Sequence, residues 1–126
     1  MKALSAGVIM LIAVLALIWC GVSFLHGYTE DFEAALYEAQ ENYISGDRDA
    51  ALESIRRLKI KEDGARDVLC MMIDHSEVAQ VDMSILRLMA LCKSDDKKGF
   101  ETEISVLRVR VNNMYASERL SWANVL

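Results

Sequence analysis

The feature that most constrains this chain is a stretch near its start that carries no charged side chain. Residues 3–25 contain no Asp, Glu, Lys or Arg, and all 19 acidic residues of the 126-residue chain follow them. As an α-helix this stretch would be about 35 Å long, enough to cross a hydrocarbon core of about 30 Å. The sequence therefore predicts a transmembrane helix in residues 1–27 that contacts the lipid bilayer through residues 3–25.

An uncleaved signal anchor fits this stretch better than a cleaved signal peptide. The apolar region of a signal peptide usually has only about 7–15 residues. Residues 21–23 (Gly-Val-Ser) nevertheless offer a weak cleavage site, so a secreted protein stays an alternative. Trp19 near the end of the stretch and Tyr28 just beyond it would form an aromatic belt at the membrane surface.

The charges on the two sides of the stretch predict its orientation. Lys2 precedes it, whereas Glu30, Asp31 and Glu33 follow it, and after the stretch no Lys or Arg occurs until Arg48. The positive-inside rule then places the N-terminus in the cytoplasm and residues 28–126 outside a cell membrane that the chain crosses once. The part after the stretch has 13 basic and 19 acidic residues, a net charge of −6, which argues against nucleic acid as a partner.

Residues 28–126 show the apolar periodicity of α-helices. Apolar residues recur three and four positions apart in four segments, no segment alternates like a β-strand, and the chain has no proline to interrupt helices. We expect an all-α domain whose helices bury these stripes: Phe32, Leu36, Ala39 and Tyr43; Ala51, Ile55, Leu58, Ala65, Leu69 and Met72, with Glu62 in the gap; Val78, Val81, Ile85, Leu88 and Cys92; Phe100, Ile104, Leu107, Val111 and Met114.

Short polar segments predict where these helices begin and end. Thr29 is a plausible N-cap that would separate the first helix of the domain from the transmembrane helix. Residues 45–47 (Ser-Gly-Asp), 74–76 (Asp-His-Ser) and 94–96 (Ser-Asp-Asp) are typical of a helix end followed by a new cap. The pattern predicts five helices, namely a transmembrane helix and two antiparallel hairpins.

The two hairpins resemble each other at an offset of 49 residues. Ser45-Gly46-Asp47-Arg48 aligns with Ser94-Asp95-Asp96-Lys97, and Ile55 then aligns with Ile104. An internal duplication would explain this match. Two unrelated helical hairpins would also show it, because every such hairpin needs capping residues and an apolar stripe at the same spacing. The hairpins would either close into a four-helix bundle or stack like tetratricopeptide units.

His75, with Asp74 and Glu77, is the one cluster of metal-ligating residue types in the pattern. A metal needs three or four convergent ligands, and His75 would point to another side of the helix than the carboxylates. We therefore interpret the segment as a helix cap with His75 packed over the hairpin, and we assign no metal. His26, the other histidine, would flank the membrane.

Other reactive side chains have structural interpretations. Cys70 and Cys92 would lie about 16 Å apart along the hairpin, too far for a disulfide, so both are expected as buried thiols. The methionines are expected mainly in the core, with an exposed groove for a partner helix as the alternative. The basic run at residues 56–61 lies between Glu53 and Glu62 and is interpreted as a solvated face.

Two short motifs resemble those of a known family. His75-Ser76-Glu77-Val78 opens a predicted helix, and Leu120-Ser121-Trp122-Ala123-Asn124-Val125 lies in the last one. With the apolar segment and the helical domain after it, these motifs resemble a bacterial family described as domain of unknown function 4363. The resemblance implies a membrane-anchored helical protein but no activity. It marks His75, Glu77, Ser121 and Asn124 as family-motif residues with a possible role in interactions.

These patterns favour a non-enzymatic function. The sequence has no Gly-x-Ser-x-Gly motif and no glycine-rich phosphate loop, so we assign no catalytic or cofactor-binding residue. We expect a structural or interaction partner of another protein, possibly integral to the same membrane, because Ser5, Ala6 and Gly7 allow close helix contact. The alternatives are a ligand-sensing bundle that acts through a partner and a secreted envelope protein.

Overall fold

The computed structural model describes the backbone of residues 1–125 and the side chains of residues 1–114 and 116. The chain forms four α-helices: α1 (Lys2–Ile44), α2 (Arg48–Met72), α3 (His75–Cys92) and α4 (Lys97–Val125). No strand occurs in residues 1–125. The expected all-α fold is confirmed.

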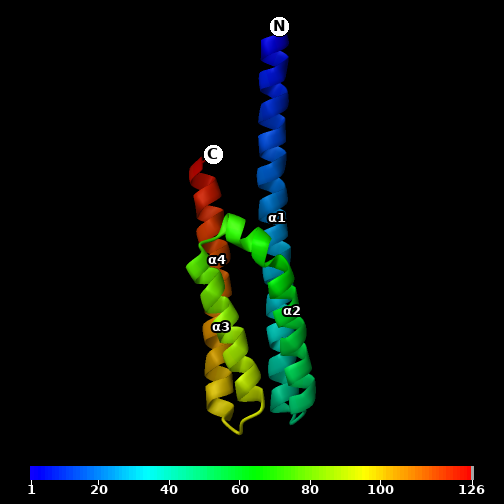
Figure 1. Cartoon of the computed structure of the whole chain (residues 1–126), viewed down its shortest axis with the longest axis vertical. Helices are drawn as coiled ribbons and strands as arrows, with labels where there is room; N and C mark the ends of the chain where they lie inside the picture. Colours follow the sequence, from blue (N-terminus) through cyan, green and yellow to red (C-terminus); the bar gives the residue numbers. More distant parts are fainter. Residues whose placement is uncertain (126) are drawn as a thin grey trace.

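The four helices form an antiparallel bundle (Figure 1). α1 packs mainly against α2 and α4, and α3 packs mainly against the same two helices, so the contacts close a ring. Stacked hairpins would leave the outer helices apart, and the chain therefore adopts the four-helix bundle of the two expected arrangements. The α1–α2 and α3–α4 turns lie at one end, and the α2–α3 turn lies at the other (Figure 1).

The predicted break at Thr29 is wrong, because α1 runs without interruption from the apolar stretch into the bundle. Thr29 is buried, and its hydroxyl donates a hydrogen bond of 2.9 Å to the carbonyl oxygen of Leu25, one turn earlier. The apolar stripe of α1 already begins at Leu25 and Tyr28, in phase with Phe32. Packing therefore supports the helix on both sides of Thr29, and the chain has four helices rather than five.

The other three predicted helix ends are confirmed. Gly46 after α1 has a positive φ of 91°, and the Asp47 side chain accepts a hydrogen bond from the backbone N–H of Ala50. Asp74 accepts one from the N–H of Ser76 and Asp96 one from the N–H of Gly99. An aspartate cap at the start of α2, α3 and α4 satisfies backbone donors that have no partner within the helix.

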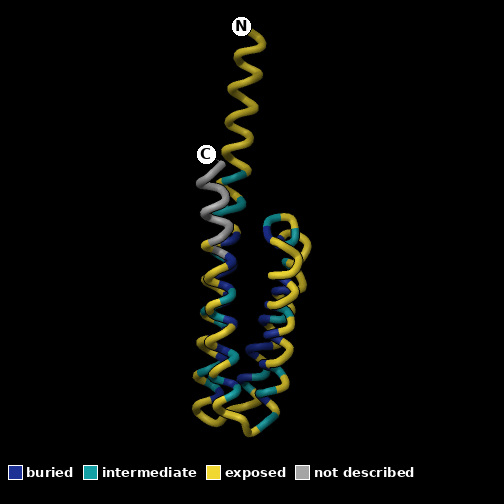
Figure 2. The backbone as a smooth tube through the Cα atoms, turned by 90° about the vertical axis from the view of Figure 1, so that its left-hand side faces the viewer, coloured by how far each residue is buried: buried dark blue, intermediate teal, exposed yellow. Residues whose placement is uncertain are grey.

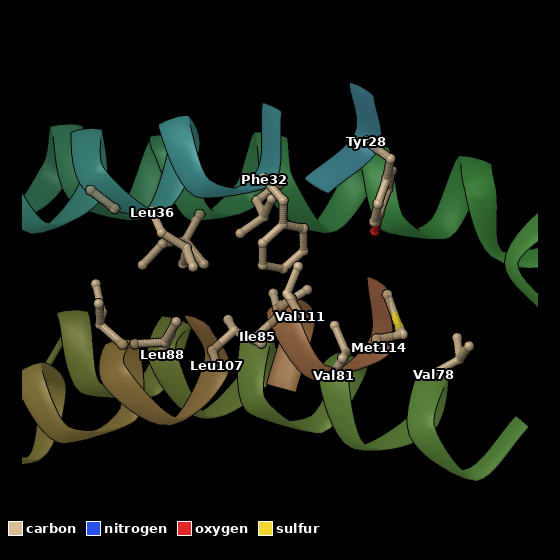
Figure 3. Close-up of a cluster of buried hydrophobic side chains, with 14 of the residues drawn as sticks. Tyr28, Phe32, Leu36, Val78, Val81, Ile85, Leu88, Leu107, Val111 and Met114 are labelled. Atoms are coloured by element: carbon tan, nitrogen blue, oxygen red, sulfur yellow. The ribbon is translucent and has the colours of Figure 1, made fainter. Parts of the chain in front are cut away.

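The predicted stripes meet in a single apolar core (Figure 3). Of the expected residues only Ala65 and Met72 are half-buried rather than buried. The apolar residues paired by the offset of 49, Ala51 with Phe100, Ile55 with Ile104 and Leu58 with Leu107, are all buried. The two hairpins thus contribute corresponding positions to the same core.

The first part of α1 projects beyond the bundle (Figure 2). Residues 1–17 are all exposed, and the bundle first approaches α1 around Gly21, where an added Cβ would lie 3.4 Å from Met72 Cε. The bundle therefore begins at the α2–α3 turn, at the same end from which the apolar helix projects (Figure 1).

Candidate functional site

The projecting part of α1 is the first candidate for a functional surface. Its large apolar side chains are exposed on all sides, with Ile9 67% and Leu17 73% exposed. α1 is the one helix in the described part of the chain that is long and apolar enough to cross a membrane. Exposed apolar surface costs roughly 25 cal/mol for each Å² in water, so transfer of this segment to an apolar environment would be favourable.

The far end of the predicted span belongs to the bundle instead. Leu25 is 1% exposed and is part of the core, and Tyr28 is buried against Phe32 with ring centroids 5.8 Å apart. The expectation that Tyr28 lies in an interfacial aromatic belt is therefore wrong. Trp19 is exposed, as that expectation requires. The exposed apolar surface of the projecting segment ends near Phe24, which is partly exposed.

A cluster of five charged side chains joins α2 to α3 and is the second candidate site. Lys59 Nζ lies 2.7 Å from Asp63 Oδ1 and also donates a hydrogen bond to Asp82 of α3. Arg66 is 3.0 Å from Asp82 on its other side. Glu62 completes the cluster, with its carboxylate 3.6 Å from Lys59 and 3.8 Å from Arg66.

Glu62 is fully buried, and neither of its carboxylate oxygens has a hydrogen-bond partner. Burial, and then the negative charge of Asp82, raise the pKa of Glu62 to about 7. Burial also acts to raise the pKa of Asp82, but the hydrogen bonds from Lys59 and Arg66 and the positive charge of Lys59 outweigh it and lower that pKa. Below about pH 7 the proton of this pair of carboxyl groups therefore lies on Glu62 rather than on Asp82.

Charge balance explains why the cluster takes up a proton. Two cations, Lys59 and Arg66, face three carboxyl groups, those of Glu62, Asp63 and Asp82, so one negative charge is in excess until Glu62 is protonated. Oxygen atoms of the three carboxyl groups lie within 4.8 Å of one another, a spacing that a metal ion could bridge. Lys59 already binds two of these groups, so a metal would have to displace its ammonium.

The sequence placed Glu62 in the gap of the apolar stripe of α2, and Glu62 is buried there. The basic run beside it was interpreted as a solvated face, and Arg56, Arg57 and Lys61 are exposed as expected. Lys59, in the middle of that run, is the exception, with its side chain 20% exposed. The burial of Glu62 could be predicted from its spacing, because it lies four residues after Leu58 and seven before Leu69, on the same face of α2. Tyr28 is a further neighbour: burial and the charge of Glu62 raise the pKa of its hydroxyl, which has no hydrogen-bond partner.

The structure separates the two family-motif residues at the start of α3. His75 lines a groove with Arg66 and Cys70 of α2, whereas Glu77 lines a cavity of about 130 Å³ with Arg110 of α4. The helix cap is confirmed at Asp74, whose pKa is lowered by hydrogen bonds from Ser76.

His75 itself is exposed, so its expected packing over the hairpin is wrong. Ser121 and Asn124, the other two family-motif residues, have side chains that lie outside the described residues.

The three cysteines are free, as the distance along the hairpin predicts for Cys70 and Cys92. Cys92 is buried, and burial raises the pKa of its thiol to about 11. Cys70 is only half-buried. The methionines divide in the same way: Met114 is buried in the core, whereas Met71 and Met83 are exposed.

The geometry defines a class of protein, a four-helix bundle whose first helix extends into an apolar segment able to span a membrane. The chain belongs to the family described as domain of unknown function DUF4363, whose model matches residues 19–125. The family resemblance expected from the motifs is confirmed. No curated protein matches the chain, and no solved structure does.

Proposed function

We propose that this protein is a single-pass membrane protein whose helical bundle acts as a structural or interaction partner of another protein and catalyses no reaction. The observation that carries the proposal is the contrast within α1. Its last part supplies core residues such as Phe32 and Leu36, while residues 1–17 are apolar and entirely exposed. A bilayer is the environment that accommodates such a helix, because its backbone is fully hydrogen-bonded and its side chains are apolar.

In this proposal the N-terminus is cytoplasmic and the bundle is extracytoplasmic. Lys2 precedes the apolar segment, and the ion pair of His26 with Glu30, 3.0 Å long, follows it. No Lys or Arg follows the apolar segment until Arg48, so the nearest Lys or Arg side chain is on its N-terminal side, which the positive-inside rule places in the cytoplasm.

Membrane fractionation with intact-mass measurement tests the anchor. An anchored protein stays with the membranes after alkaline carbonate extraction and retains Met1. A soluble product whose N-terminus lies near Phe24 would instead show that the segment is a cleaved signal peptide. A single cysteine introduced at Ile44, in the far end of the bundle, should react with an impermeant maleimide added to intact cells. Protection of this cysteine until the cells are lysed would reverse the orientation.

Crosslinking in intact membranes tests the partner. Gly7 has no neighbouring atom within 4 Å of an added Cβ, so its face is open to a second helix. We expect a specific crosslinked protein that is lost in Gly7→Leu, which blocks close approach, and retained in Val14→Leu, which keeps an apolar side chain on the same helix. Recovery of no protein above background from crosslinked membranes would contradict an interaction function.

A further inference from the structure

We propose that the α2–α3 turn together with the end of α2 before it, residues 71–73 (Met-Met-Ile), contacts the lipid bilayer and gives the bundle a second point of attachment beside α1. This inference rests on the membrane anchor of the proposed function. Its partner is the boundary between the lipid headgroups and the acyl chains.

The height of the turn along α1 is the first argument. An added Cβ on Gly21 would lie 3.4 Å from the terminal methyl carbon of Met72, so the turn reaches the level of Gly21. The middle of the uncharged stretch, residues 3–25, is residue 14, and Gly21 lies about 10 Å beyond it at 1.5 Å per residue. Half of the hydrocarbon core is about 15 Å thick. The tip of Met72 therefore lies about 5 Å inside the boundary of the hydrocarbon core, among the upper parts of the acyl chains.

The composition of the turn is the second, independent argument. The two turns at the far end of the bundle are polar, with Ser-Gly-Asp at residues 45–47 and Ser-Asp-Asp at residues 94–96. At the end that faces the apolar segment, the turn between α2 and α3 consists of Ile73 and Asp74, and the two residues before it, Met71 and Met72, are also large and apolar (Figure 1).

Exposure of the turn shows which side chain is left for lipid. Met72 and Ile73 pack onto the core, whereas Met71 is 86% exposed. Val68, one helical turn earlier on the same face of α2, is also exposed. Methionine is flexible and apolar, which suits a disordered lipid boundary.

Polar and charged side chains lie next to the turn, on the side toward the rest of the bundle. Asp74 and His75 are exposed at the start of α3, and His26 and Glu30 pair on α1. These groups lie where headgroups and water begin if Met71 lies among the upper acyl chains. The unbroken α1 and the turn would then hold the long axis of the bundle upright on the membrane.

Fluorescence quenching by brominated lipids tests the turn in the full-length protein. A bimane label is placed on single cysteines, Leu11→Cys, Met71→Cys or Ile60→Cys, in a Cys20→Ala, Cys70→Ala background; Cys92 is buried and stays. The protein is reconstituted in phosphatidylcholine and phosphatidylglycerol vesicles with and without mid-chain bromine. Ile60 is the matched control, since it is exposed on the same face of α2 but lies eleven residues, about 16 Å, further from the membrane.

We expect bromine to quench the labels at Leu11 and Met71 and to leave the label at Ile60 unchanged. Quenching at Leu11 with none at Met71 would overturn the lipid contact of the turn and leave the anchor intact. Absence of quenching at Leu11 would overturn the anchor itself, and the turn with it. Each variant must match the wild-type helix content by circular dichroism, so that a folding failure is not taken for a change in depth.

Discussion

Tyr43 and Phe100 stack face to face at the far end of the bundle, with ring centroids 3.9 Å apart and planes 13° from parallel. Tyr43 is in the last turn of α1 and Phe100 is in the first turn of α4, 57 residues later, so the pair closes the ring of helices between the first and the last. The Tyr43 hydroxyl lies 3.5 Å from the carbonyl oxygen of Ser94, at the limit of a hydrogen bond. The Arg48 guanidinium lies 6.0 Å from the Tyr43 ring.

Truncation of Phe100 should therefore open this end of the bundle. Phe100→Ala removes a fully buried ring and leaves a cavity, so we expect a loss of about 3–5 kcal/mol in the free energy of unfolding. Tyr43→Phe is the matched control, because it keeps the stacked ring and removes only the weak hydrogen bond, at a cost below about 1 kcal/mol. Thermal and denaturant unfolding of the full chain in nanodiscs measures both. Similar losses in the two variants would contradict the stacking as the main contribution.

The buried carboxyl of Glu62 predicts how stability depends on pH. Its pKa is about 7 in the folded protein and 4.5 when unperturbed, so the folded state binds the proton more tightly than the unfolded state. The stability from this proton is complete below pH 4.5, falls as the pH rises and is lost above pH 7. At 1.36 kcal/mol per pKa unit the loss is on the order of 3 kcal/mol.

Glu62→Gln should remove this dependence, because glutamine has the shape of the protonated acid and leaves two cations facing two carboxylates. We expect the free energy of unfolding of the variant to equal that of the wild type near pH 4.5 and to be larger than that of the wild type at pH 8. Asp63→Asn, at the neighbouring residue, is the control. The pKa of Asp63 is lowered, chiefly by Lys59, so Asp63 titrates below the pH range in which Glu62 changes its charge. Melting temperatures measured across this pH range test the prediction. If the melting temperature of Glu62→Gln falls with rising pH as steeply as that of the wild type, another group causes the pH dependence of stability.

Much of the fold could be predicted because each helix carries its own local signal. The stripe from Val78 to Cys92 and the caps at Asp47 and Asp74 depend on residues within one or two helical turns of each other, and the structure has them as expected. The closure into a bundle could not be predicted. It depends on contacts such as Tyr43 with Phe100, between residues far apart in the chain.

The errors have a common physical origin in the competition between local preference and burial. Thr29 has the chemistry of a cap, but the packing of Leu25 and Phe32 on either side keeps it helical. Glu62 has the polarity of a surface residue, but its position in the stripe buries it, and Lys59 and Arg66, one helical turn before and after it on α2, compensate its charge. In both cases spacing predicted the environment better than residue type did.

Two glycines should respond in opposite directions to the same substitution. Gly46 has a φ of 91°, a conformation that residues with a Cβ adopt at a cost of roughly 1–2 kcal/mol, so Gly46→Ala should destabilise the protein by about that amount. Gly64 lies inside α2 with no atom within 4 Å of an added Cβ, so Gly64→Ala should stabilise it by about 0.5–1 kcal/mol. Unfolding of both variants in denaturant measures the difference. A gain in stability from Gly46→Ala would contradict the left-handed turn between α1 and α2.

Thr29→Val tests whether α1 is continuous between the membrane segment and the bundle. In the structure the buried Thr29 hydroxyl bonds only to the Leu25 carbonyl, a group that already accepts a helical hydrogen bond, so an apolar side chain of the same shape should change stability by less than about 1 kcal/mol. At an N-cap the same substitution would cost about 0.5–2 kcal/mol and would fray the following turn. Amide hydrogen exchange distinguishes the two cases. Continuous helix predicts unchanged protection of the amides of Glu30 to Phe32 in the variant, and faster exchange there would restore a helix start at Thr29.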